Sequence, residues 1–170
     1  ECGLDYDAHR ISISDPEDQF TPEFLSLNPN NKIPAMLDPN GPDGAPIGIF
    51  ETGAILIYLG DKTGKFLPKS GAARYHTLQW LMWQMGGLGP MFGQVGFFHR
   101  YKGKEIEDPR PRTRYYNEAR RLLGVLNKQL EGRDWITGEY SIADMAVGPW
   151  LRTVRVNYEA EAETGMDTFN

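Results

Sequence analysis

The sequence predicts an α/β domain followed by an all-helical domain. Short apolar segments with strand character alternate with helical segments in the first part of the 170-residue chain. A Gly/Pro-containing segment around Leu67 ends that pattern, and long amphipathic helices occupy the rest. We therefore place the first domain at residues 1–67 and the second at residues 72–170.

The elements of the first domain follow the order strand, helix, strand, strand, helix. Each combines an apolar pattern with a start or stop signal, and a loop rich in Pro, Gly, Asn and Asp joins the last two strands. The predicted elements are a strand Tyr6–Ile13, a short helix with Thr21 as cap and Pro22 at its first position, strands Ile33–Leu37 and Gly48–Phe50, and a helix Thr52–Lys62 with Thr52 as N-cap.

Two backbone features of this domain suit a small peptide ligand. Pro34 stands near the start of a strand, where proline gives no N–H to a neighbouring strand. With a cis bond before Pro34, the N–H and C=O of Ile33 point at solvent or at a ligand. The helix that follows Glu51 offers free N–H groups to a carboxylate, and the Glu51 side chain offers an anion to an ammonium group. These groups together would hold a small peptide by its ends.

The same segments carry a family resemblance. Asn28-Pro29, Lys32-Ile33-Pro34 and Phe50-Glu51-Thr52-Gly53, in this order and spacing, resemble the glutathione-binding half of the glutathione transferases. The resemblance implies a thioredoxin-like first domain. It also implies that Ile33 pairs through its backbone with the cysteinyl part of glutathione, while Glu51 and Thr52 hold the γ-glutamyl end.

The resemblance further implies that a strand and most of a helix precede Glu1. That strand would lie inside the sheet, and its absence would leave backbone groups unpaired. The residue that activates the glutathione thiol should lie in the same upstream part, so the catalytic residue is unknown. Cys2 appears at the end of this first helix rather than at its start, where cysteine nucleophiles of the family lie, and a small incidental residue is the better interpretation.

Three further side chains match glutathione contacts by resemblance. Gln19 corresponds to a residue at the glycyl end, and Lys32 has the charge to steady the glycyl carboxylate; for both, the alternative is a solvated surface residue. The run Leu78–Gln94 and the pair Arg114-Tyr115 most resemble the Nu class, whose members act as disulfide-bond reductases and use the matching arginine to contact glutathione. The alternative for Arg114 is a surface charge paired with Glu118 one helical turn on.

The second domain contains three predicted helices. The first is interrupted by a glycine-rich segment, the second follows a proline-containing loop, and the third opens with a capping box in which Ser141 and Asp144 bond to each other's main chain. The predicted segments are the helix Ala72–Met91 with its interruption at Gly86–Pro90, the loop Asp108–Pro111, the helix Arg112–Leu130, and the capping box Ser141–Asp144.

Composition excludes several classes of function. A net charge of −5 argues against a nucleic-acid surface, and no apolar run reaches membrane-spanning length. A single cysteine excludes an intrachain disulfide framework and fits the cytoplasm. The three histidines share no metal-ligand spacing, so we expect no metal site.

We therefore predict an enzyme that binds glutathione as co-substrate between the two domains and reduces disulfide bonds. The alternatives are glutathione conjugation or lyase activity on a small electrophile, and a non-catalytic module for protein assembly. The resemblance also implies a homodimer with Phe50 and the following helix near the partner. It implies further helices after the acidic stretch Tyr158–Asn170 as well.

Overall fold

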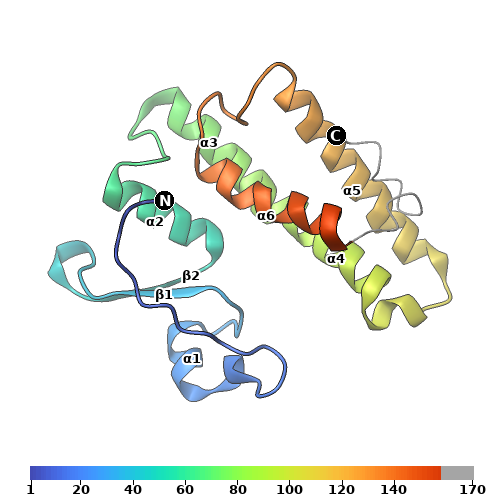
Figure 1. Ribbon diagram of the computed structural model, residues 1–170, viewed down its shortest axis with the longest axis horizontal. Coiled ribbons are helices and arrows are strands. Elements are labelled where there is room, and N and C mark those ends of the chain that lie inside the picture. The colour runs from blue at the N-terminus through green and yellow to red at the C-terminus, as the bar shows by residue number, and fades with distance from the viewer. Residues whose placement is uncertain (158–170) are drawn as a thin grey trace. The chain divides into compact units, whose positions relative to one another are not determined.

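A computed structural model of the chain describes residues 1–157 and divides into two compact units (Figure 1). Unit 1 comprises Glu1–Lys65, and unit 2 begins at Phe66. The acidic stretch 158–170 lies outside the described residues.

Unit 1 is built on a two-stranded antiparallel sheet with helices against it. The strands β1 and β2 lie side by side (Figure 1), with Ala35 opposite Phe50 and Asp38 opposite Ile47. Helices α1 and α2 both contact the two strands. The elements of unit 1 are the 3₁₀ turn η1 (Asp18–Phe20), α1 (Pro22–Leu27), β1 (Ala35–Asp38), the 3₁₀ turn η2 (Pro42–Gly44), β2 (Ile47–Phe50) and α2 (Thr52–Thr63).

The short helix α1 forms as its sequence predicts. The Thr21 hydroxyl accepts a hydrogen bond from the Phe24 N–H at 3.3 Å, and Pro22 occupies the first helical position. Phe24 turns into the core of the unit, where it is buried. The cap, the proline and the buried aromatic ring thus fix a helix of only six residues.

The predicted strand Tyr6–Ile13 is wrong. This segment forms no strand, and its single β-type contact is an isolated bridge from Ile13 to Glu17. A strand requires a neighbour for its N–H and C=O groups, and within residues 1–157 this segment has none. Tyr6 is accordingly 86% exposed, so the alternating sequence pattern does not correspond to a buried face.

The regular secondary structure of unit 2 is all helical in its described part. The predicted interruption of the first long helix is confirmed, since a π-helical turn with two glycines joins α3 to α4. The predicted loop at Asp108–Pro111 is wrong, because Pro109 is already the first residue of α5. The Asp108 carboxylate caps this helix by accepting a hydrogen bond from the Arg110 N–H at 3.0 Å. The elements are α3 (Gly71–Trp83), the π turn η3 (Gln84–Leu88), α4 (Gly89–Arg100), the 3₁₀ turn η4 (Lys102–Glu105), α5 (Pro109–Leu130) and α6 (Ile142–Asn157).

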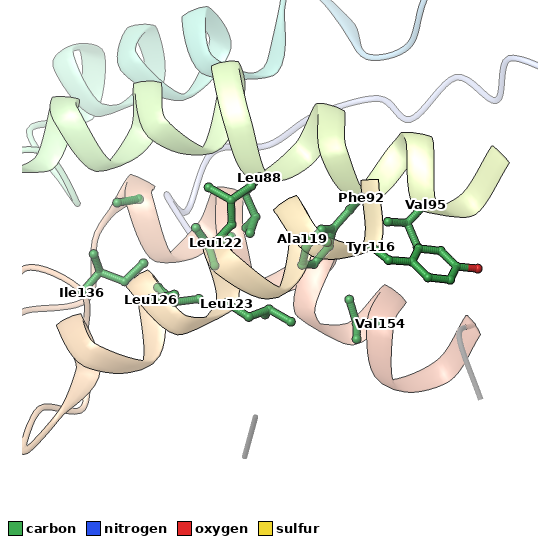
Figure 2. Packing of buried hydrophobic residues seen from close by; sticks show 12 residues of the cluster. Leu88, Phe92, Val95, Tyr116, Ala119, Leu122, Leu123, Leu126, Ile136 and Val154 are labelled. Carbon is green, nitrogen blue, oxygen red and sulfur yellow. The ribbon is translucent and has the colours of Figure 1, made fainter. Parts of the chain in front are cut away.

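The core of unit 2 lies between α4, α5 and α6 (Figure 2), with Phe92 and Leu122 almost fully buried. The Asp144 half of the predicted capping box at the start of α6 is confirmed, whereas the Ser141 hydroxyl bonds to the Ala143 N–H and not to the predicted Asp144 N–H. The Asp144 carboxylate accepts hydrogen bonds at 2.9 Å from the Ser141 N–H and hydroxyl and from the Ile136 N–H. The Ser141 hydroxyl also accepts from the Ala143 N–H at 3.3 Å. The box therefore ties the preceding loop to the helix as well as closing the helix end.

Candidate functional site

One end of the hairpin in unit 1 brings two of the predicted site segments together. Ala35 pairs with Phe50, so Pro34 and Glu51 follow directly beyond that pair on adjacent strands. The bond between Ile33 and Pro34 is cis, as the family resemblance implies. Antiparallel neighbours lie about 5 Å apart. The Ile33–Pro34 and Glu51–Thr52 segments therefore form one local surface.

The main chain of Ile33 is available to a ligand. Ile33 is 51% exposed, and within residues 1–157 its N–H and C=O make no hydrogen bond. The ladder between the strands begins two residues later, at Ala35. A free donor and a free acceptor on one residue can pair with an extended peptide in the manner of an added strand.

The second feature of this surface is the start of α2. The N-cap is Glu51, whose C=O accepts from the Ile55 N–H at 2.9 Å, and Thr52 is the first helical residue. The prediction of Thr52 as N-cap is therefore wrong by one position. No side chain caps this end of α2. The uncapped N–H groups of the first turn and the helix dipole together favour a bound carboxylate.

Glu51 has an unusual backbone conformation. Its φ of 72° and ψ of 119° lie outside the regions that side chains other than glycine normally adopt. Such a conformation costs about 1–3 kcal/mol and persists where the surrounding structure enforces it, often at a binding site. The Glu51 side chain is exposed and makes no hydrogen bond or ion pair within the described residues. Its carboxylate is therefore free to meet a cation.

The other predicted contacts in unit 1 differ in their surroundings. Lys32 is exposed and has no ion-pair partner within residues 1–157. Gln19 is only 7% exposed, and its Oε1 is buried without a hydrogen-bond partner among the described residues. The alternative of a solvated surface residue therefore fails for Gln19. Gln19 lies in η1, which packs on α1.

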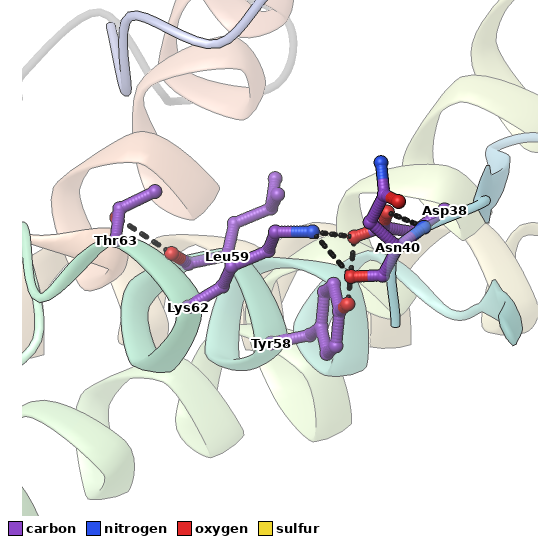
Figure 3. A network of polar contacts seen from close by, with 6 residues as sticks. All are labelled: Asp38, Asn40, Tyr58, Leu59, Lys62 and Thr63. Atoms are coloured by element: carbon purple, nitrogen blue, oxygen red, sulfur yellow. Dashed lines mark hydrogen bonds and ion pairs between the residues drawn. The ribbon is translucent and has the colours of Figure 1, made fainter. Parts of the chain in front are cut away.

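A polar network secures α2 at the far end of the hairpin (Figure 3). The Asp38 carboxylate accepts from the Tyr58 hydroxyl at 2.7 Å and from the Lys62 ammonium, which also donates to the Asn40 C=O at 2.9 Å. The Lys62 and Tyr58 hydrogen bonds lower the pKa of Asp38 to about 2. Because α2 runs back along the hairpin from Glu51, this attachment also fixes where the helix starts.

Arg114 belongs to unit 2, on the exposed surface of α5. Glu118 accepts two hydrogen bonds of 2.8 Å from Arg121, which lower the pKa of its carboxyl group, and the nearby charge of Arg114 lowers it further. The alternative of a pair between Arg114 and Glu118 is therefore present as a charge interaction, without a hydrogen bond or close ion pair between the two side chains. The Arg114 guanidinium has no hydrogen bond or ion pair within the described residues and lines a shallow depression beside Met91. It is therefore available to an anion.

Within residues 1–157 there is no cluster of three or more His, Cys, Asp or Glu side chains that could hold a metal ion. None of the helices that these residues form is both long and apolar enough to cross a bilayer.

Sequence reasoning did not assign a role to Asn28, which the structure places directly behind the Ile33 loop. Asn28 is 2% exposed, and its side chain bonds to the main chain of Asn30 and Lys32. Its position in the Asn28-Pro29 motif was visible, but a buried amide cannot be distinguished from a turn residue by sequence alone.

Comparison with known proteins identifies the family to which the chain belongs. Residues 1–62 match the family model for the N-terminal domain of glutathione S-transferases. The chain is 49% identical over 153 residues to disulfide-bond oxidoreductase YfcG of Escherichia coli (strain K12). The aligned region covers 89% of this chain and 70% of that protein. The chain belongs to the glutathione S-transferase family. It is also 44% identical over 153 residues to disulfide-bond oxidoreductase YghU of the same organism, of which it spans about half, 51%.

Solved glutathione transferase structures agree. A family member from Pseudomonas fluorescens pf-5, with two glutathione molecules bound, matches with 61% identity and a TM-score of 0.95 over 99% of this chain and 74% of that one. A glutathione transferase from Pseudomonas putida, with one glutathione disulfide per subunit, matches with 60% identity and a TM-score of 0.94 over 99% of this chain and 73% of that one. The predicted fold class, thioredoxin-like and then helical, is thereby confirmed.

Proposed function

We propose that this glutathione S-transferase binds glutathione through unit 1 and uses it to reduce disulfide bonds. The observation that carries the proposal is the hairpin end, where the free main chain of Ile33 adjoins Glu51 and the uncapped start of α2. Support also comes from the two Escherichia coli relatives that are named disulfide-bond oxidoreductases.

The chemical groups of glutathione match this surface. Its γ-glutamyl end carries a carboxylate and an ammonium group, which suit the start of α2 at Thr52 and the Glu51 carboxylate. Its cysteinyl residue has an N–H and a C=O that complement the Ile33 main chain. The glycyl carboxylate is assigned to Lys32 and Gln19, a cation and an amide.

The proposed reaction is thiol–disulfide exchange. The thiolate of bound glutathione attacks one sulfur of the substrate disulfide, forms a mixed disulfide and releases the other sulfur as a thiolate, which takes a proton. A second glutathione thiolate attacks the mixed disulfide and yields glutathione disulfide and the second substrate thiol. Two glutathione molecules thus supply two electrons, and Cys2 takes no part. Replacement of Cys2 by serine should therefore leave turnover unchanged.

Two assays on the full-length protein test this function. Reduction of 2-hydroxyethyl disulfide by glutathione, followed through NADPH and glutathione reductase, should be robust, and conjugation of 1-chloro-2,4-dinitrobenzene should be weak. Robust conjugation without disulfide reduction would replace the proposal with a conjugating transferase. Absence of glutathione binding in calorimetry would instead favour a non-catalytic assembly module.

We also propose that the protein acts as a homodimer in the cytoplasm, with Phe50 and α2 near the partner subunit. The support is the family resemblance, together with the single cysteine of the sequence. Sedimentation equilibrium of the full-length protein tests the dimer, since replacement of Phe50 by glutamate should shift the mass to that of one chain. A single-chain mass for the wild-type protein would refute the dimer without affecting the glutathione site.

A further inference from the structure

We propose that Asn28 is a positioning residue that orients the Ile33 N–H toward glutathione. This inference rests on the proposed function, because it concerns how the glutathione-binding main chain is held in place. It assigns a role to a buried side chain that has no direct access to a ligand.

Asn28 is bonded at both ends of its amide. Its Nδ2 donates to the Lys32 C=O at 2.5 Å, and its Oδ1 accepts from the Asn30 N–H at 2.9 Å. Its main chain ends α1, since its N–H donates to the Phe24 C=O at 2.9 Å and its C=O accepts from the Asn31 N–H at 3.1 Å. The side chain therefore connects the end of a helix to the loop that carries Ile33.

The bond to Lys32 acts on Ile33 because the two residues share one peptide group. The Lys32 C=O and the Ile33 N–H belong to the same planar unit, and this peptide bond is trans. In a trans peptide the two groups point in opposite directions. Fixing the Lys32 oxygen toward the buried Asn28 therefore turns the Ile33 N–H away from the interior, toward the surface where Ile33 is half exposed.

The same bond strengthens the donor that it orients. A carbonyl oxygen that accepts a hydrogen bond polarises its peptide group, and the N–H on the far side becomes a better donor. Asn28 is 2% exposed, so water does not compete for its amide. An oriented and polarised N–H loses less freedom when glutathione binds than a mobile one does.

The experiment uses the full-length protein with Asn28→Asp and Asn28→Ala. The first keeps the acceptor for Asn30 but replaces the donor to Lys32 by a carboxylate oxygen, and the second removes both. We expect the dissociation constant for glutathione, from calorimetry, to rise at least about fivefold, which corresponds to about 1 kcal/mol. The KM for glutathione should rise in parallel while kcat at saturating glutathione changes little.

Two controls separate positioning from other effects. Asn30→Asp adds the same charge to the same turn, but the Asn30 side chain is exposed and only its N–H bonds to Asn28. Phe24→Leu loosens the buried face of α1 without removing a hydrogen bond. Neither control should raise the dissociation constant more than twofold, and Phe24→Leu should lower the unfolding midpoint at least as far as Asn28→Asp does.

A second measurement does not depend on glutathione. The ¹H–¹⁵N amide signal of Ile33 in the ligand-free protein should shift or broaden in both Asn28 variants and stay in place in Asn30→Asp. An unchanged Ile33 signal, or equal affinity losses in Phe24→Leu and Asn28→Asp, would overturn the positioning role. Lack of glutathione binding by the wild-type protein would overturn the proposed function instead, and the Ile33 signal would still decide whether Asn28 orients this peptide.

Discussion

Replacement of Glu51 by glycine should improve folding and impair binding at the same time. Glu51 has a φ of 72°, and its carboxylate has no partner within the described residues. Its side chain therefore contributes little to the folded state, while its positive φ is one that glycine, lacking a Cβ, adopts at lower cost than glutamate. A ligand site explains why a glutamate stands where glycine would fit better.

The magnitudes follow from these two features. Relief of backbone strain contributes about 1–3 kcal/mol, and the greater freedom of glycine in the unfolded chain costs about 0.5–1 kcal/mol. Unit 1 should therefore become up to about 2.5 kcal/mol more stable. Loss of a hydrogen bond to a charged group costs about 1.5–3 kcal/mol, so the dissociation constant for glutathione should rise roughly 10- to 100-fold.

Glu51→Ala is the matched control, because alanine lacks the carboxylate but keeps the Cβ that makes this conformation unfavourable. Both variants should lose the same affinity in calorimetry, and only the glycine variant should gain stability in urea unfolding. If Glu51→Gly unfolds more easily than Glu51→Ala, the strain at this position is not real. If either variant binds glutathione as the wild type does, the Glu51 carboxylate is not part of the site.

Three further predictions concern the network, the second unit and the capping box. The folded pKa of Asp38 is about 2, below the unfolded value of about 3.9. Its pairing with Lys62 therefore contributes stability above about pH 4 that is lost as the pH falls toward 2. In an acid titration, the Asp38→Asn variant should lose less stability over this pH range than the wild type does. Arg114→Ala should raise the KM for glutathione about two- to tenfold, whereas Arg121→Ala, which removes an arginine already paired on the same helix, should not. Asp144→Ala removes three hydrogen bonds and should lower the unfolding free energy of unit 2, measured in denaturant, by about 2–4 kcal/mol. A decrease below about 1 kcal/mol would contradict the structural role of Asp144.

Signals that are local in the sequence predicted the structure well. Thr21-Pro22 and the Ser141–Asp144 box specify helix starts, because each cap is formed by residues within one turn of the helix end. The glycine-rich interruption after Trp83 was equally visible, since glycine weakens a helix from within its own backbone. These features require no knowledge of distant contacts.

Features that depend on distant partners were not predictable from the sequence. The alternation in Tyr6–Ile13 is a pattern of side chains, and it says nothing about whether a neighbouring strand is present. The burial of Gln19 and the two-ended bonding of Asn28 depend on how α1 packs, which a single polar residue does not reveal. The φ of Glu51 is imposed by the junction of β2 and α2, against the preference of glutamate itself.

The candidate site is therefore a property of strand pairing more than of side-chain identity. Main-chain groups at Ile33 and at the start of α2 provide much of the proposed recognition, and their alignment depends on the pairing of Ala35 with Phe50. A slip of one residue would displace the two segments by about 3.3 Å along the strand, more than the length of a hydrogen bond. The Asp38 network at the far end of the hairpin opposes such a slip, because it joins β1 to the helix that follows β2. Asn28 acts at the near end, so the structure holds the binding surface from both sides with residues that need not touch the ligand.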